Sequence, residues 1–251
     1  MDHIVATLKA FLSMISSPSR FALAGLTTIF LLSSFVGCSK DETATVASLK
    51  ALKVLVVPDA KGQASGINML PTDPAKLDEA IDLVCQLGGC KTVTALEGVP
   101  ITNDHLAKLG RVKSLVQIEI NDGSITDEGI AHLTGLSKLE SLTVANNAVT
   151  DESMPSFAKL KKLNMLNLNG TQVKGGYDAL AGLSNLQWML LGGVKISDAD
   201  ATAISSFPAI THVTLNDNTE ISEEAVKTLK SNKKCTVDYA NVAPFAGQPA
   251  Q

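Results

Sequence analysis

The residues best suited to chemistry in this 251-residue chain are four histidines and four cysteines, and their spacing does not build a reaction centre. A second closely spaced cysteine pair is missing, and no histidine lies beside Cys85 or Cys90, so we predict no zinc or other metal site. The G-x-S-x-G, P-loop and H-E-x-x-H motifs are absent. We therefore predict that the chain is not an enzyme and holds no cofactor.

Two cysteines flank a glycine pair and raise the question of a disulfide. Cys85 and Cys90 are five residues apart on either side of Gly88-Gly89. An oxidising compartment would favour a bridge, whereas helix geometry would hold the side chains apart and leave two buried thiols. The sequence leaves both alternatives open. Cys235 replaces an aliphatic residue of the repeat described below and is predicted to be a core residue.

The elements that position these side chains come from an internal repeat with the pattern L-x-x-L-x-L. Its first residues are spaced 24, 24, 23 and 24 residues apart, and such a fixed period is typical of a solenoid. The alternating L-x-L end predicts a short strand with one buried face. A degenerate copy precedes the array at Cys90, and another follows at Cys235. The full copies are Leu115/Ile118/Ile120, Leu139/Leu142/Val144, Leu163/Leu166/Leu168, Leu186/Met189/Leu191 and Ile210/Val213/Leu215.

The first half of each repeat has a helical pattern instead. Ile130, Leu133 and Leu136 recur at intervals of three, which places them on one helix face. Thr126 followed by Asp127 and an acidic neighbour is a typical helix start, because a hydroxyl caps the free N–H groups and the acids favour the positive end of the dipole. A unit of one strand and one short helix cannot bury its apolar side alone, so neighbouring units must stack.

Segment 125–130, ITDEGI, resembles the first residues of a leucine-rich repeat of the bacterial [IV]-T-D-x-G-[LI] subtype. Segments 149–152 and 196–198 match this motif in part, and the resemblance extends from about Leu77 to Tyr239. It implies an α/β solenoid, with a curved parallel sheet on the concave side and short helices on the convex side. Cysteine-containing relatives carry Cys near the strand, where this chain has Ala, Ser, Asn or Gly, so their ubiquitin-ligase adaptor role is not carried over.

The stacked strands predict a binding surface, because side chains on either side of each buried strand residue point away from the core. Ser141 and His212 lie three repeats apart on it, roughly 14 Å at ordinary strand spacing, too far to act together in catalysis. Trp188, the single tryptophan, stands where the core does not need it. It either belongs to a binding patch or covers the sheet beneath the C-terminal segment. The predicted ligand-binding residues on the concave face are Gln117, Glu119, Ser141, Thr143, Met165, Asn167, Trp188, Leu190, His212 and Thr214.

Asparagines follow several strands, for example Asn146-Asn147, Asn169 and Asn216. Their amides could form a cation or sugar site, but the interpretation we favour is that they hydrogen-bond the backbone of the turns.

The N-terminus predicts export and anchoring. Residues 1–37 are predicted to be a signal peptide, because basic Lys9 and Arg20 precede the uncharged segment 21–39. The end of that segment resembles a bacterial lipobox with Cys38 as the lipidated residue. The alternative is an uncleaved transmembrane anchor. In Gram-negative sorting, Ser39 would favour the outer membrane, so we expect a lipid-anchored protein of the cell envelope that faces the periplasm.

The remaining segments divide the chain into parts. Residues 38–50 are predicted to be a polar tether, 51–100 an N-terminal cap with a degenerate first repeat, 101–239 the repeats and 240–251 a loose tail. Within the cap, Leu52, Leu55 and Val57 show the repeat spacing and predict a first strand. Residues 59–72 are predicted to be a loop, and Asp73-Pro74 predicts the start of a helix that ends before Gly88.

The composition and charge exclude some classes of binding partner. The net charge is −4 and no basic stripe is evident, so we predict no nucleic-acid partner. The content of 45% hydrophobic but 4% aromatic residues fits a core of aliphatic ladders. We expect an envelope-anchored module that binds a protein or peptide on its concave face; the alternative is a structural or glycan-binding envelope protein. The partner and the oligomeric state stay undetermined at this stage.

Overall fold

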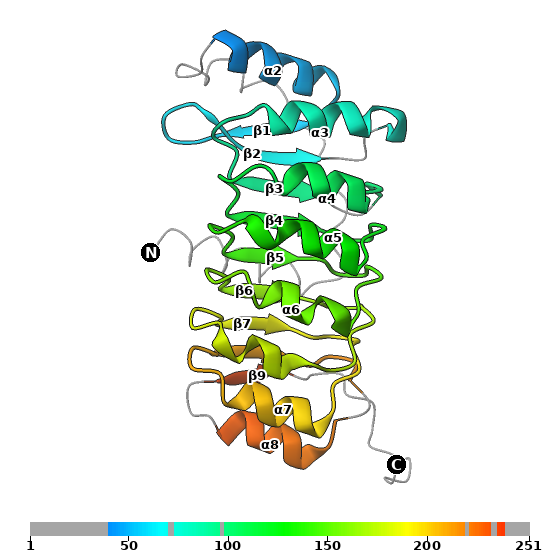
Figure 1. Ribbon diagram of the computed structural model, residues 1–251, viewed down its shortest axis with the longest axis vertical. Coiled ribbons are helices and arrows are strands. Elements are labelled where there is room, and N and C mark those ends of the chain that lie inside the picture. Colours follow the sequence, from blue (N-terminus) through cyan, green and yellow to red (C-terminus); the bar gives the residue numbers. More distant parts are fainter. Residues whose placement is uncertain (1–39, 70–72, 96–97, 219–220, 232–234, 239–251) are drawn as a thin grey trace, which may run out of the picture. The chain divides into compact units, whose positions relative to one another are not determined.

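The computed structural model describes residues 40–69, 73–95, 98–218, 221–231 and 235–238. The predicted signal peptide, Cys38 and the predicted tail lie outside the described residues. One sheet runs through the described part in the strand order β1 to β9 (Figure 1). Its strands are β1 (Leu55–Pro58), β2 (Ala64–Met69), β3 (Thr92–Ala95), β4 (Gln117–Ile120), β5 (Ser141–Thr143), β6 (Met165–Asn167), β7 (Trp188–Leu190), β8 (His212–Thr214) and β9 (Thr236–Asp238).

The strands stack in register, and this register builds the core. Strands β2 to β9 are parallel, and β1 pairs antiparallel with β2. Burying each aliphatic side chain of this size contributes roughly 2 kcal/mol. The stacking confirms the prediction that aliphatic residues recur at the repeat spacing. The aligned core residues, each at most 1% exposed, are Ile67, Val93, Ile118, Leu142, Leu166, Met189 and Val213.

The helices lie together on one face of the sheet (Figure 1), and we call the other face the open face. The α-helices are α2 (Lys40–Ala51), α3 (Leu77–Cys85), α4 (Asn103–Leu109), α5 (Asp127–His132), α6 (Met154–Phe157), α7 (Asp198–Ser205) and α8 (Glu223–Ser231). Short 3-10 helices are η1 (Pro74–Lys76), η2 (Leu133–Gly135), η3 (Asp151–Ser153) and η4 (Tyr177–Gly182).

Hydrogen bonds at the helix starts tie three pairs of neighbouring turns together. A side-chain oxygen in the first helical residue accepts a hydrogen bond from the backbone N–H of the capping Thr or Ser one turn later. The pairs are Asn103 with Thr126 (3.0 Å), Asp127 with Thr150 (2.9 Å) and Asp198 with Ser222 (2.8 Å).

The Thr-Asp motif therefore has a second use beyond starting a helix. Thr126 is the capping residue of α5, as predicted, but its hydroxyl accepts from the Nδ2 amide of Asn103 (2.8 Å) and does not cap α5. Burial alone would raise the pKa of Asp127, but hydrogen bonds from Ser153 and Thr150 outweigh it and hold that pKa below its ordinary value. The ionised carboxylate thus links two neighbouring turns.

The predicted tether is wrong over most of its length. Helix α2 occupies Lys40–Ala51 and packs against β1 and α3. Its residues Val46 and Leu49 are buried in the core. Two apolar residues three positions apart are neighbours on one helix face, and the surrounding polar sequence hid them.

The first strand has a different register from the predicted one. Leu55 and Val57 are 42% and 47% exposed, whereas Val54 and Val56 are buried. A shift by one residue exchanges the two faces of a strand, and β1 shows this shift because it is the antiparallel half of a hairpin. The parallel position falls to β2, which lies inside the segment predicted to be a loop. The helix start at Asp73 is confirmed, since its carboxylate accepts from Ala75 N–H.

Candidate functional site

The predicted binding residues form two adjacent rows along the open face. In the first row, Gln117 lies beside Ser141, then follow Met165, Trp188 and His212 in consecutive strands. Each of these five side chains is half-buried. Ser141 and His212 are separated by two intervening strands, so the structure does not bring them together, as the spacing predicted.

The second row runs parallel to the first. Glu119, Thr143, Asn167, Leu190 and Thr214 occupy consecutive strands. Thr143 departs from the prediction, because it is only 5% exposed. It lies between Glu119 and Asn167, which occupy the aligned positions of the neighbouring strands. Burial also raises the pKa of Glu119.

An aromatic stack lies at the C-terminal end of the two rows. The rings of Trp188 and His212 lie face to face, with their centroids 3.5 Å apart and an angle of 1° between the planes. Thr211 Oγ1 and His212 Nδ1 are 2.8 Å apart, a hydrogen-bond distance that fixes the imidazole. Burial lowers the pKa of His212, so the ring is neutral at neutral pH. Met165 and Leu190 extend this stack into an apolar patch of four residues, which we call the Trp188 patch.

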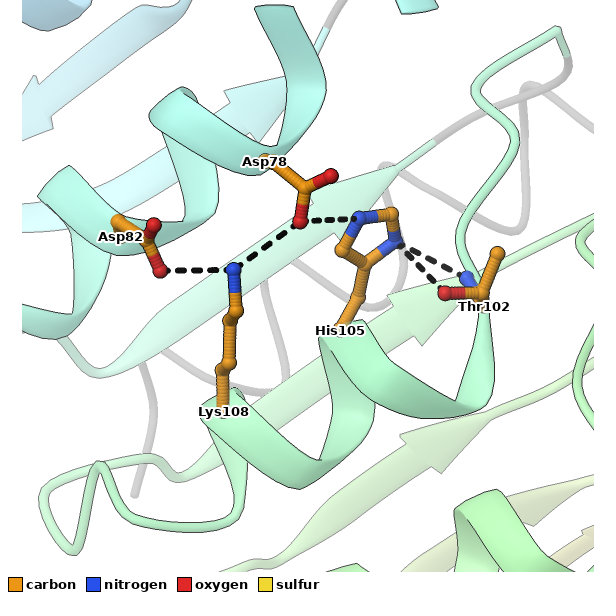
Figure 2. Close-up of polar contacts among 5 residues, drawn as sticks. All are labelled: Asp78, Asp82, Thr102, His105 and Lys108. Atoms are coloured by element: carbon orange, nitrogen blue, oxygen red, sulfur yellow. Dashed lines mark hydrogen bonds and ion pairs between the residues drawn. The ribbon is translucent and has the colours of Figure 1, made fainter.

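A second cluster of polar residues joins the N-terminal cap to the first regular helix (Figure 2). Lys108 Nζ lies 3.0 Å from Asp78 Oδ1 and 2.8 Å from Asp82 Oδ1. His105 Nε2 is 3.5 Å from the same Asp78 oxygen, and His105 Nδ1 accepts a hydrogen bond from Thr102 N–H at 3.0 Å. The cluster bridges α3 and α4 on the helical side of the sheet, so its geometry serves to hold two turns together.

The stability of this bridge should depend on pH through His105. Burial lowers the pKa of His105 below its ordinary 6.5, and Asp78 opposes the shift without cancelling it. The unfolded chain then binds the proton more readily than the folded chain, so stability should fall as pH drops below about 6.5. Protonation would also turn Nδ1 into a donor and break the bond from Thr102 N–H.

Urea unfolding at pH 7.5 and 5.5 checks this expectation. Glutamine at position 105 can accept the same backbone bond without titrating, so His105→Gln should lose less stability than the wild type on acidification. The titration of His212 contributes to the loss of stability in both proteins, so it cancels when the two losses are compared. Equal losses in the two proteins would contradict the role of His105.

The cysteines among the described residues are free thiols. Cys85, half-buried, and Cys90, fully buried, are unbridged, which corresponds to the second alternative left open by the sequence. Burial raises the pKa of Cys90 to about 12 and also raises that of Cys85. Cys235 packs partly buried against the core, where its position in the repeat predicted it.

The asparagines after the strands form hydrogen bonds with the backbone of the turns. Asn147 accepts from one backbone N–H and donates to two backbone carbonyls. Asn218 donates to Leu191 O at 2.7 Å, and Asn169 accepts from Gly192 N–H at 2.6 Å. These contacts support the turn interpretation over a ligand site. No group of three His, Cys, Asp or Glu side chains that could hold a metal ion occurs among the described residues.

The fold has relatives among solved structures. No protein-family model and no curated protein sequence matches the chain. The structure is similar to that of an internalin (inlF) from Listeria monocytogenes, with a TM-score of 0.54 and 26% identity over 63% of this chain and 44% of that one. Internalins are leucine-rich repeat proteins. This chain has a leucine-rich repeat fold. It spans less than half of that internalin's length.

A second internalin, inlC2 from the same organism, matches the leucine-rich repeat chain with a TM-score of 0.43 and 21% identity, over 67% of this chain and 80% of that one. Across the described ranges of the leucine-rich repeat chain, each helix is too short or too polar to cross a bilayer.

Proposed function

We propose that this leucine-rich repeat protein binds a protein or peptide partner on the open face and that the Trp188 patch is the centre of contact. The observation that supports this most is the stack of Trp188 on His212, a pair of half-buried aromatic rings in strands next to Met165 and Leu190. Large aromatic side chains dominate the binding energy of protein interfaces, because they bury much apolar area at low entropic cost. The more polar residues around the patch, such as Ser141 and Asn167, form a rim of the kind that surrounds such a centre.

Replacing Trp188 with alanine tests the proposal. A truncated interface aromatic typically costs 1 to 2 kcal/mol or more, so we expect capture of the partner from envelope extract to fall about tenfold. His212→Ala should cause a smaller loss, because it removes the support of the tryptophan ring. His132→Ala, on the exposed side of α5, is the matched control and should leave capture unchanged.

Quantitative mass spectrometry of proteins cross-linked near Trp188 gives the readout. Equal capture by wild type and Trp188→Ala would refute the patch. Unaltered binding of the variant to purified wall material, with no cross-linked protein in the wild type, would favour the structural or glycan-binding alternative.

We also propose that the protein is tethered to the cell envelope through lipid on Cys38. The support is the order of segments in the sequence, in which a basic region and an uncharged segment end at this cysteine. A single acyl chain gives only marginal binding, so a second chain or a second contact with the membrane is needed for stable attachment. Release of a Cys38→Ala variant into the soluble fraction is the expected result, and continued membrane attachment would point to an uncleaved anchor.

A further inference from the structure

The fold gathers cations at one edge of the sheet, although the sequence shows no basic stripe. Strands β2 to β9 are parallel, so the turns that lead into them meet at the same edge, which we call the entry edge. The turns into β3, β4, β5 and β6 carry exposed cations that are about twenty residues apart in the sequence. These residues are Lys91, Arg111, Lys113, Lys138, Lys161 and Lys162.

These cations are poorly neutralised. Among the described residues, no ion pair joins any of them to a carboxylate. Acidic residues at the same edge include Glu140, before β5, Glu42, in the first turn of α2, and Asp59, whose charge interacts with Lys91. Acidic side chains such as Asp122 and Asp151 follow the strands and so lie at the opposite edge. The chain is negative as a whole but carries a positive entry edge.

Stabilisation of helix ends does not explain the cations. A lysine near a helix C-terminus interacts favourably with the helix dipole, and every turn of the stack would benefit equally. The turns into β7 and β8, however, have Ser184-Asn185 and Pro208-Ala209 at the corresponding places. The fold therefore forms without cations in these two turns, so the cations in the turns into β3 to β6 require another reason.

The N-terminal helix begins at the same edge. Three residues separate the end of α2 from β1, and β1 runs opposite to the other strands. A 12-residue helix is about 18 Å long, more than the roughly 13 Å of a four-residue strand, so α2 reaches from one edge of the sheet to the other. Helix α2 therefore begins on the side where the parallel strands start (Figure 1). Cys38 precedes it by two residues, at most about 7 Å of extended chain.

We propose that the entry edge rests on an anionic lipid surface. It would supply the second membrane contact that an acylated Cys38 requires, and the inference depends in this respect on the proposed anchoring. Each Lys or Arg close to an anionic bilayer adds about 1 kcal/mol, which is a factor of about five in binding. The contact would hold the sheet edge-on to the membrane and leave the Trp188 patch accessible from the side.

Labelling of lysines on vesicle-bound full-length protein tests this orientation. On vesicles that contain about one third phosphatidylglycerol, Lys138, Lys161 and Lys162 should react more slowly with a water-soluble amine reagent than on phosphatidylcholine vesicles, because the headgroups cover them. Lys174, which follows β6 at the opposite edge, should react equally on both. Equal rates for all four lysines on the two vesicles would overturn the proposal.

A variant built from the protein's own turns gives an independent test. Lys161→Ser with Lys162→Asn copies the residues of the next turn, Ser184 and Asn185, and should fold normally. We expect about 25-fold weaker binding to phosphatidylglycerol vesicles at low salt and no difference on phosphatidylcholine or in about 0.5 M salt. The control, Lys174→Ser with Lys195→Asn, removes as much charge from the opposite edge and should bind as the wild type does.

The outcomes separate this contact from the anchor. Failure of the wild type to bind neutral vesicles would count against anchoring at the N-terminus. The binding of wild type and variant to anionic vesicles could still be compared in that case. A variant that binds anionic vesicles as tightly as wild type would overturn the lipid contact while the anchor stands. Protection of the lysines by polyglutamate but not by anionic vesicles would assign the edge to an acidic protein partner and would also overturn it.

Discussion

Replacing Asn147 with alanine is expected to lower the free energy of unfolding by about 3 to 4 kcal/mol. The side chain is buried inside the turn after β5, where the backbone leaves the sheet. Its Oδ1 accepts from Ile125 N–H at 3.1 Å, and its Nδ2 donates to Ile120 O at 3.2 Å and to Ala145 O at 2.9 Å. Alanine would remove three bonds of roughly 1 kcal/mol each and leave the Ile125 N–H unpaired away from water.

Two further variants show whether the bonds, and not the volume, carry this stability. The turn one repeat later has Thr171 at the corresponding position, and its hydroxyl donates to Leu168 O at 2.7 Å. Asn147→Thr should therefore recover part of the loss. Asn185→Ala removes an exposed asparagine whose Nδ2 donates to Lys161 O, and it should cost less than about 1 kcal/mol. A urea midpoint for Asn147→Ala close to that of Asn185→Ala would refute the role of Asn147.

The repeat in the sequence predicted most of the fold, because one physical requirement recurs in every turn. Residues such as Leu142 and Leu166 must be apolar to stack, so the period of the core is visible in the sequence itself. Left-handed backbone after the strands follows the same period, at Asp122, Asn146, Gly170, Gly193 and Asp217, with φ between 55° and 68°. Gly, Asn and Asp tolerate this conformation best. The repeat that begins near residue 173 lacks the Thr-Asp motif, but Gly193 after its strand occupies the same left-handed position as in the other repeats.

The N-terminal turn was harder to predict because it does not repeat. Helix α2 presents only Val46 and Leu49 to the core, within an otherwise polar segment. Strand β1 runs antiparallel, so the leucine spacing that marks a buried strand elsewhere places Leu55 on the open face. The cap ends the stack with contacts unlike those between repeats, so the spacing that marks buried residues in the repeats does not identify them in the cap.

For the candidate site, alignment of the repeats predicts which residues of neighbouring strands lie side by side, but it does not predict how their side chains pack. Placing Trp188 beside His212 requires only the register of the strands, which the sequence predicts. The parallel stacking of their rings and the burial of Thr143 depend on side-chain packing between turns. The His105 cluster was missed because its members, for example Asp78 and His105, are far apart in the sequence and share no motif. The entry edge was missed because its cations recur about once per repeat and form no continuous basic run.

Replacing Gly110 with alanine should destabilise the fold by about 3 kcal/mol, at the upper end of the range for overpacking. Gly110 ends α4 with φ −60° and ψ −13°, a conformation that any residue adopts. Helix propensity alone would favour alanine by up to about 1 kcal/mol. However, a Cβ at this position would lie 2.3 Å from His132 O and 3.1 Å from His132 C in the next turn. The obstructing atoms are backbone, so α5 would have to move away from α4.

Gly88 provides the matched control for this close approach between turns. It also follows a helix, it is exposed, and a Cβ there meets nothing within 4 Å. Gly88→Ala should change stability by less than about 0.5 kcal/mol or raise it slightly, because alanine lowers the entropy of the unfolded chain. Urea unfolding of both variants measures the difference. If both alanines had the same small effect, the spacing of neighbouring turns would not be set by backbone contact at Gly110, and the stack would tolerate sliding of α5 over α4.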